Sequence, residues 1–348
     1  MSGITAPARW SLGELEAVES CPLCGSRSPG LSAGQRRDDA EAFPDPWRYL
    51  ECLGCRALYL SPRPDPESLG RAYGSYYTHE TSSSMAATGG DRLAVGLINT
   101  YLNSRYCMQR KPTLDAARPL WWLAAPLRMK LDFMARHMPR DLCGKGLRLL
   151  DIGCGNGDFL TLAREMGFRS SGCEPDPASV ALCRARGLEV VEGDAHHPSL
   201  GEGSFEVITM NHVLEHVTDQ ARLLARALQL LAPGGRLWLC LPNPHALGRK
   251  TLGIAWKGFH PPYHLAIPTA AWVRTALEQA GFDAIRQVKR GPQSKGLWRE
   301  SFELSKREGR AISHAAQACL RLTSNLIGCL TPVWDEEQIH VAYRPGAR

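Results

Sequence analysis

From residue 146 onward, short runs of apolar residues alternate with longer segments in which apolar residues recur at helical spacing. The apolar runs that we expect to form strands lie at residues 147–153, 170–175, 188–194, 205–213, 236–243, 283–291 and 339–345. Residues 270–282 predict a helix that ends at Gly281, and a helical insert is expected at about 296–333. Because strands that alternate with helices are typical of βαβ units, the pattern predicts an α/β domain over 141–348. Its mostly parallel sheet of seven strands should carry helices on both faces.

The segment before this domain also has helical periodicity. The apolar residues that show it include Leu127, Leu131 and Met134, with Met138 beyond them. We expect a helical cap over 91–140, with Trp121 and Trp122 packing it against the core, although tryptophans could also line an acceptor pocket. The polar, glycine-rich stretch 78–91 predicts a loop, so we interpret 76–140 as loop and cap.

Cysteines near the N-terminus occur in two C-x-x-C pairs that are separated by twenty-seven residues. The four are Cys21, Cys24, Cys52 and Cys55. Four thiolates in two knuckles are the ligand set that structural zinc prefers, and they leave no open position for catalysis. A redox pair is the weaker alternative, because nothing thioredoxin-like surrounds these residues. We therefore predict a zinc-binding module and linker over 1–75, and we expect the remaining cysteines to be small buried hydrophobes.

Composition narrows the functional classes only a little. The chain has 348 residues, of which 44% are hydrophobic and 22% charged, as is usual for globular proteins. No apolar run reaches the roughly eighteen residues of a membrane span, and no basic segment precedes an apolar one at the start. A cytoplasmic location without a transmembrane segment is expected. The net charge of +6 is compatible with anionic substrates or RNA and does not choose between them.

The first strand of the α/β domain leads directly into three alternating glycines, Gly153, Gly155 and Gly157. Glycine permits a sharp turn and lets the backbone lie against a ligand with no Cβ atom between them. A dinucleotide fingerprint would require glycine at position 158, where this chain has Asp158. The loop therefore predicts a nucleotide-type cofactor, and disfavours one bound through a pyrophosphate.

Acidic residues follow the next two strands. Glu174 ends the second strand, where a carboxylate can accept hydrogen bonds from both ribose hydroxyls. Asp194 follows the third strand and is placed to accept from an adenine amino group. The other residues that we assign to the predicted cofactor site are Asp151, Asn156, Ala195 and Asn211.

These segments, in this order, resemble the class I S-adenosylmethionine-dependent methyltransferases, over about 146–290 and the final strand. The resemblance implies a Rossmann-like fold and S-adenosylmethionine as cofactor. It also implies that the glycine loop holds the methionine portion, Glu174 the ribose and Asp194 the adenine. Together with the stretches 58–64 and 73–77, the cysteine pairs resemble bacterial methyltransferases whose N-terminal zinc modules accompany activity on sugars or other small secondary metabolites.

Methyl transfer from a sulfonium is an in-line displacement, so proximity and alignment supply much of the acceleration. A base that deprotonates the acceptor is the further requirement, and histidine is the natural candidate. The candidate catalytic residues lie in two clusters: His212 and His216 with Glu215 between them, and His260 with Tyr263 and His264. We rank His264 slightly above His216, and a structural role remains open for each histidine taken singly.

The string H-x-x-E-H at 212–216 also matches an inverted zinc-protease motif, a weaker alternative inside this fold. The predicted function is methylation of a small-molecule or sugar-linked acceptor, with O-methylation favoured over C or N. Two alternatives remain: an RNA methyltransferase, or a catalytically inactive protein that binds the cofactor. The residues after the fourth strand, Asn211, His212, Val213 and Leu214, do not form the tetrad used on planar base nitrogens, which disfavours nucleic acid.

Overall fold

The structure, a computed structural model, describes residues 14–28, 30–37, 47–69, 92–292 and 295–346. The polar loop predicted at 78–91 lies outside these residues, and so does the predicted boundary between residues 75 and 76. Among the described residues, no helix combines the length and the hydropathy that a membrane span requires.

The central sheet has seven strands in the order β12-β13-β10-β9-β6-β7-β8. Its strands are β6 (Arg148–Ile152), β7 (Arg169–Glu174), β8 (Glu189–Glu192), β9 (Phe205–Asn211), β10 (Leu231–Pro242), β12 (Asp283–Val288) and β13 (Glu337–Tyr343). The strands from β10 to β8 are parallel, and β13 runs antiparallel to both β10 and β12. Strands β6 and β9 are buried over most of their length because helices cover both faces of the sheet. The predicted seven-stranded α/β fold is confirmed.

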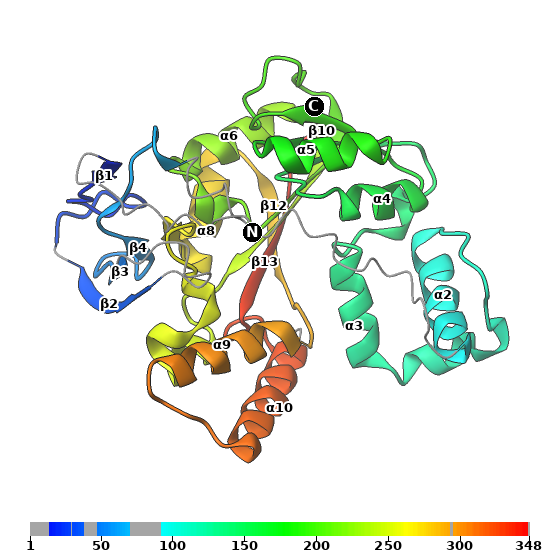
Figure 1. Cartoon of the computed structure of the whole chain (residues 1–348). Coiled ribbons are helices and arrows are strands. Elements are labelled where there is room, and N and C mark those ends of the chain that lie inside the picture. The colour runs from blue at the N-terminus through cyan, green and yellow to red at the C-terminus, as the bar shows by residue number, and fades with distance from the viewer. Residues whose placement is uncertain (1–13, 29, 38–46, 70–91, 293–294, 347–348) are drawn as a thin grey trace, which may run out of the picture.

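Helices cover the two faces of this sheet (Figure 1). Those of the α/β domain are α4 (Asp158–Glu165), α5 (Pro177–Ala185), α6 (Gln220–Leu230) and α8 (Ala270–Ala280). Apolar residues of α6 and α8 pack in one core cluster with Leu150 and Ile152, and those of α4 pack in another with Leu149 and Val207. Helix α8 ends as predicted at Gly281, which has the left-handed φ of +101° at the C-cap.

The helical cap consists of α2 (Arg92–Tyr106), the 3₁₀ helix η3 (Asp115–Trp122) and α3 (Ala125–Met134). Trp121 is buried and its ring lies 4.7 Å from that of Tyr101. The expectation for Trp122 is wrong, since its side chain is 79% exposed. Met138 lies beyond the end of α3 and is buried in the core cluster below the cap.

The N-terminal module contains two small antiparallel sheets. One pairs β1 (Leu15–Glu16) with β5 (Arg63–Pro64). The other has the order β11-β4-β3-β2 and consists of β2 (Leu31–Arg36), β3 (Trp47–Glu51), β4 (Leu58–Leu60) and β11 (Ala266–Ile267). Because β11 comes from the α/β domain, the module shares a sheet with that domain, and Figure 1 shows it beside α8.

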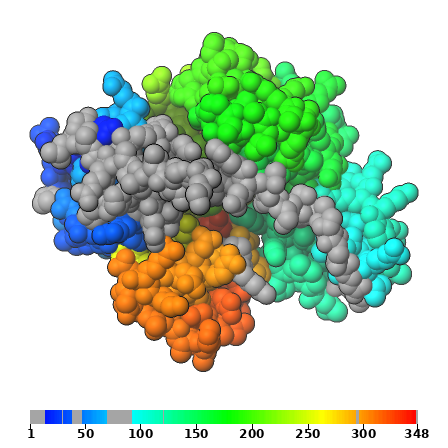
Figure 2. All heavy atoms as spheres, viewed as in Figure 1, coloured from blue at the N-terminus to red at the C-terminus, as the bar shows by residue number. Residues whose placement is uncertain are grey.

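The predicted helical insert consists of α9 (Lys295–Arg307) and α10 (His314–Leu330). Trp298 and Phe302 of α9 pack against Leu252, which ends the short helix α7 (Leu247–Leu252). Figure 2 shows the insert, in orange, projecting at the lower edge of the molecule.

Candidate active site

The glycine loop joins β6 to α4, and three of its residues must be glycine. Gly153, Gly155 and Gly157 have φ values of +67°, +52° and +78°, in the left-handed region that side chains disfavour. A Cβ atom at Gly153 would lie 2.6 Å from the Val213 side chain, and one at Gly157 would lie 2.4 Å from Leu188. The loop is therefore held close against its surroundings at the carboxyl end of β6.

Glu174 lies at the end of β7, beside this loop. Its Oε2 accepts a 2.9 Å hydrogen bond from the backbone N–H of Gly155, and its Oε1 accepts one of 3.1 Å from that of Asp176. Burial raises the pKa of the Glu174 carboxyl, and the two N–H donors act in the opposite direction. The carboxylate is thus attached to the loop that would carry the cofactor.

The other predicted cofactor residues lie around the same edge of the sheet. Asp194 follows β8 with a side chain 69% exposed, and its Oδ1 accepts from the His196 N–H at 2.8 Å. Ala195 is fully buried, and Asn211 ends β9. Asn156 accepts from the Asp158 N–H at 3.1 Å, which fixes the first turn of α4. The polar side chains of Asp194 and Asn211 remain accessible to a ligand.

Asp151 differs from the rest of this set because its carboxylate is completely buried. Arg136, which follows the cap helix α3, donates to both carboxylate oxygens, and Thr209 Oγ1 donates to Oδ1 at 2.9 Å. The Arg136 guanidinium also lies 3.6 Å from the centre of the Phe159 ring. Asp151 therefore attaches the cap to the sheet, and its contact with the cofactor stays a prediction.

His212 follows β9 with a left-handed φ of +55°, an uncommon conformation for a residue other than glycine. Its Nδ1 lies 2.8 Å from Glu215 Oε1, and its Nε2 lies 2.7 Å from Glu337 Oε1. Arg290 donates to the second Glu337 oxygen at 2.7 Å. Burial lowers the pKa of His212, but the two carboxylates outweigh it and hold that pKa well above its ordinary value. Both ring nitrogens are thus protonated donors, and His212 does not fit the predicted role of base.

The remaining candidate bases form one cluster of rings, in which His260 and His264 are buried and His216 is half-buried. The His264 ring centre lies 4.7 Å from that of His216 and 5.2 Å from that of His260. Burial lowers the pKa of His216 to about 4, and burial together with neighbouring cations lowers the pKa values of His260 and His264 well below the ordinary value. Tyr263 is also buried, against the N-terminal module and 4.8 Å from the His260 ring. Neutral imidazoles therefore come together at the carboxyl end of β9.

Contacts within this cluster set the protonation of His264. Its Nδ1 lies 2.8 Å from the carbonyl oxygen of Gly258, which can only accept, so Nδ1 carries the proton and Nε2 the lone pair. The Nε2 atom lies 3.8 Å from Glu215 Oε1. Glu215 is fully buried, and no described residue hydrogen-bonds its Oε2.

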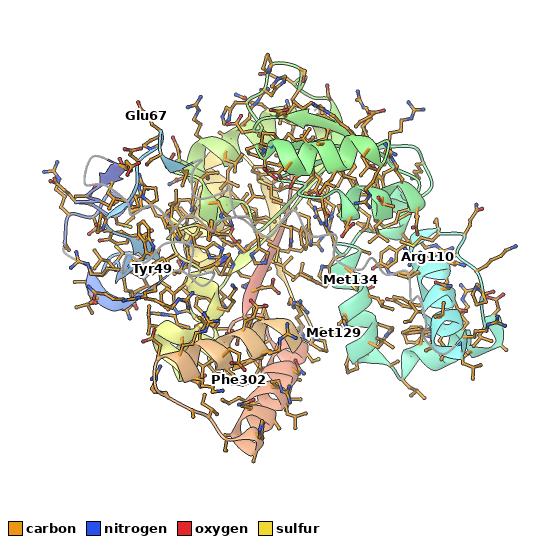
Figure 3. All side chains as sticks on the ribbon, in the orientation of Figure 1. Tyr49, Glu67, Arg110, Met129, Met134 and Phe302 are labelled. Atoms are coloured by element: carbon orange, nitrogen blue, oxygen red, sulfur yellow. The ribbon has the colours of Figure 1, made fainter. Side chains whose placement is uncertain are left out.

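The N-terminal module supports the segment that carries His260 and His264. The hydroxyl of Tyr49, on β3, lies within hydrogen-bond distance of the carbonyl oxygens of Phe259 and, at 2.7 Å, His264. Figure 3 labels Tyr49 in the N-terminal module. The N–H of Leu60 donates to the carbonyl oxygen of Leu265 at 2.9 Å. The N–H of Leu265 in turn donates to the carbonyl oxygen of Glu215 at 2.8 Å. The module, the histidine segment and the turn after β9 are thus hydrogen-bonded in series.

The four predicted zinc ligands come together at the edge of this module. The sulfurs of Cys21 and Cys55 lie 3.7 Å apart, and those of Cys24 and Cys52 lie 3.6 Å apart. Four sulfurs bound at about 2.3 Å around one tetrahedral zinc lie about 3.8 Å from one another. Each C-x-x-C pair forms the same kind of turn. In the first, the Gly25 N–H donates to the Cys21 carbonyl oxygen at 2.9 Å, and in the second the Arg56 N–H donates to the Cys52 carbonyl oxygen at 2.9 Å. The cysteines therefore fit a structural zinc ion.

Two further groups of potential metal ligands adjoin the histidines. The ligand atoms of Glu215, His216 and His264 all lie within 4.8 Å of one another, as do those of His212, Cys240 and Glu337. His212 and His216 belong to different groups, so they do not face one ion as the inverted protease motif requires.

Comparison with known proteins decides the family. Residues 123–287 match a family model described as a methyltransferase domain. A ubiquinone biosynthesis O-methyltransferase from Xanthomonas oryzae pv. oryzae (strain PXO99A) is 31% identical over 179 residues, which cover 47% of this chain and 73% of that protein. A protein of the same name from Xanthomonas campestris pv. campestris (strain B100) matches with the same identity and coverage. The chain belongs to the class I S-adenosylmethionine-dependent methyltransferases.

Solved structures similar to this methyltransferase include further enzymes that use the same cofactor. A SAM-dependent methyltransferase from Archaeoglobus fulgidus is 19% identical, with 61% of this chain and 94% of that chain covered at a TM-score of 0.43. A phosphoethanolamine N-methyltransferase 2 from Haemonchus contortus is 17% identical, with 72% and 60% covered at a TM-score of 0.44.

Several residues of the methyltransferase's site carry no local signal in the sequence. Arg136 holds Asp151, Glu337 and Arg290 hold His212, and Tyr49 holds the histidine segment. Each acts on a residue that is distant in the chain, up to 215 positions away for Tyr49 and His264. Glu215 differs from these residues, because its place in H-x-x-E-H grouped it with His212 in the sequence, and the two side chains are in contact.

Proposed function

We propose that this methyltransferase transfers a methyl group to a hydroxyl oxygen of a small-molecule or sugar-linked acceptor. The observation that carries the proposal is the cluster of neutral imidazoles that follows β9, in which His260 and His264 are buried and His216 is half-buried. An acceptor hydroxyl must lose a proton to a base, whereas a neutral amine can attack the methyl group through its own lone pair. The printed names of the Xanthomonas relatives, which are O-methyltransferases, support oxygen as the methylated atom.

In this proposal S-adenosylmethionine, when bound, supplies an electrophilic methyl group on its sulfonium. The backbone of the loop at Gly153, Gly155 and Gly157 would lie against its methionine portion, in a turn that glycine permits. Glu174 accepts from the ribose hydroxyls, and Asp194 accepts from the adenine amino group. Asn156, Ala195 and Asn211 complete the surface around the ligand. These residues orient the methyl donor, and its proximity to the acceptor supplies much of the rate acceleration.

His264 is the proposed base. Its Nε2 carries the lone pair, and burial excludes water from it. When Nε2 takes the acceptor proton, the ring becomes an imidazolium 3.8 Å from Glu215 Oε1, which stabilises the new charge. His212 positions that carboxylate through its 2.8 Å contact with the same Oε1 atom. His216 and His260 enclose the His264 ring, and His216 is the second candidate for the base.

The zinc ion has a structural role in this proposal. Cys21, Cys24, Cys52 and Cys55 would hold it, and their four thiolates close its coordination sphere. Zinc would fix the two knuckles on either side of β2 and β3. Thr269 Oγ1 donates to the Cys55 carbonyl at 3.3 Å, and Trp272 Nε1 donates to that of Leu23 at 2.7 Å. The knuckles therefore hold α8 and β11, and through them the segment of His264.

We expect the protein to carry about one zinc per chain, which Cys21→Ser and Cys52→Ser variants lose. Elemental analysis measures the metal, and Cys319→Ser, which changes an exposed cysteine outside the cluster, is the matched control. Hydrogen exchange should quicken at the amides of Leu60 and Leu265 in the zinc-free variants and stay slow in β6 and β9, which zinc does not contact. Undiminished zinc in both variants would contradict the assignment and direct attention to Glu215, His216 and His264.

Labelling tests the proposed acceptor class. The enzyme is incubated with methyl-labelled S-adenosylmethionine and a cell extract, in parallel with an extract treated with RNase. The proposal predicts label in a low-mass, RNase-resistant product. Label that RNase removes from the high-mass fraction would identify an RNA methyltransferase instead. Cofactor binding without any label transfer would identify a catalytically inactive protein.

A further inference from the structure

An apolar stripe runs along the exposed side of α10. Leu322, Leu326 and Leu330 recur every four residues and are 70%, 61% and 64% exposed. Val333 and Trp334 follow directly after the helix and are also exposed, at 54% and 47%. Large apolar residues scattered singly on a surface are normal, but a contiguous group of this kind marks an interaction site.

A second exposed group lies where η3 meets α3. Trp122 and Leu123 are 79% and 85% exposed, and Leu127 on the first turn of α3 is 42% exposed. The two groups belong to neighbouring parts of the molecule, because α3 and α10 both contact Gly291. A Cβ atom at Gly291 would lie 2.5 Å from the Met129 Cβ of α3, and its N–H donates to Gly328 of α10 at 3.3 Å.

In Figure 1 both α10 and the junction of η3 with α3 lie in the lower part of the molecule, and Figure 3 shows Met129 between them. We call the two exposed groups together the apolar rim. Its members are Trp122, Leu123, Leu127, Leu322, Leu326, Leu330, Val333 and Trp334.

Within the two stretches that contain the apolar rim the charges are all positive, and Asp115, Asp132, Glu308 and Asp335 stand at the four ends of these stretches. The stretches 116–131 and 309–334, which contain the whole rim, have no aspartate or glutamate. Their cations are Arg118, Arg128, Lys130, Arg310 and Arg321. Arg128 lies 5.7 Å from the centre of the Trp122 ring, and Lys250 lies 5.0 Å from that of Trp334. Each exposed tryptophan thus has a cation against it.

We propose that the apolar rim docks on an anionic phospholipid surface. Leucine and tryptophan insert at the boundary between headgroups and acyl chains, and flanking lysine and arginine attract anionic headgroups. A second copy of the chain fits less well, because pairing two rims would bring their cations together. The docking goes beyond the proposed methyl transfer and does not depend on it.

Co-sedimentation of the full chain with vesicles tests the docking. Binding is expected with vesicles of phosphatidylcholine and phosphatidylglycerol, weaker binding with phosphatidylcholine alone, and a loss of affinity as salt is added. The double variant Leu326→Ser/Leu330→Ser should bind at least about tenfold more weakly. Arg128→Gln should weaken binding about fivefold. Leu31→Ser changes an equally exposed leucine (57%) on β2, outside the rim, and should bind as the unaltered protein does.

Two outcomes would overturn the proposal. One is sedimentation that is the same with and without anionic vesicles. The other is a dimer, seen by light scattering, that the leucine substitutions dissociate, since this would make the rim a contact between copies. Circular dichroism and calorimetry with S-adenosylmethionine verify that each variant is folded. Should the double leucine variant fail to fold, Arg128→Gln and Lys130→Gln test the same surface through charges exposed beside it.

Discussion

Replacement of Gly155 by arginine is expected to abolish measurable binding of S-adenosylmethionine. Gly155 has a φ of +52°, and its N–H donates to Glu174 at 2.9 Å. An arginine side chain at this position would occupy the space of the ligand. Its Cβ atom would also strain the left-handed backbone of the loop that is hydrogen-bonded to Glu174. Overpacking alone costs about 1–3 kcal/mol, or about 5- to 150-fold in affinity. Because the arginine also occupies the space of the ligand, we expect a loss at the upper end of this range or beyond, about 100-fold or more by calorimetry.

Gly203→Arg is the matched control for this substitution. Gly203 also has a left-handed φ, of +62°, but nothing lies within 4 Å of the position that its Cβ would occupy. The control therefore carries the same backbone strain and the same added charge away from the loop. Equal affinity in Gly155→Arg and Gly203→Arg would show that the ligand does not lie against the glycine loop.

Replacement of His264 by alanine is expected to lower the single-turnover rate of methyl transfer by about 10²–10⁴-fold, the usual contribution of a general base. Affinity for S-adenosylmethionine should change little, because His264 is not among the residues proposed to hold it. His216→Ala should have a smaller effect. His245→Ala removes a partly exposed imidazole outside the ring cluster, and its rate should stay near that of the unaltered enzyme.

The pH dependence of the rate distinguishes a base from a structural histidine. Burial and neighbouring His216 hold the pKa of His264 well below 6.5, so the ring stays neutral as the pH falls from 8 to 6.5. The rate should be level over that range and should decline only when the pH falls through the lowered pKa. His264→Ala should lack this decline. If neither histidine variant slows transfer, positioning alone drives the reaction and the cluster is structural.

Strands such as β9 and the second half of β10 were predictable because apolar residues dominate them and polar residues, glycine or proline bound them. The end of α8 was predictable because Gly281 adopts a conformation that favours glycine. By contrast, β11 has only two residues and follows a proline-rich segment. It pairs with β4 some two hundred positions earlier, and local periodicity contains no information about such a partner.

The residues of the site likewise divide into those that the sequence predicts and those that it does not. The glycines, Glu174 and the four cysteines could be predicted because spacing along the chain places them together. The role of His212 could not, because the carboxylate of Glu337 that contacts its Nε2 belongs to the last strand, 125 positions away. Trp122 was misjudged for a related reason. Adjacent residues on a 3₁₀ helix point in different directions, so Trp121 is buried while Trp122 is exposed.

The bond formed in the labelled product tests the central claim most directly. The labelled product from the RNase-treated extract is isolated and fragmented in a mass spectrometer to locate the methyl group. Methylation of a hydroxyl through a buried base predicts a methyl ether whose formation slows strongly in His264→Ala. A methyl group on nitrogen or carbon, formed at the same rate by both enzymes, would contradict the account.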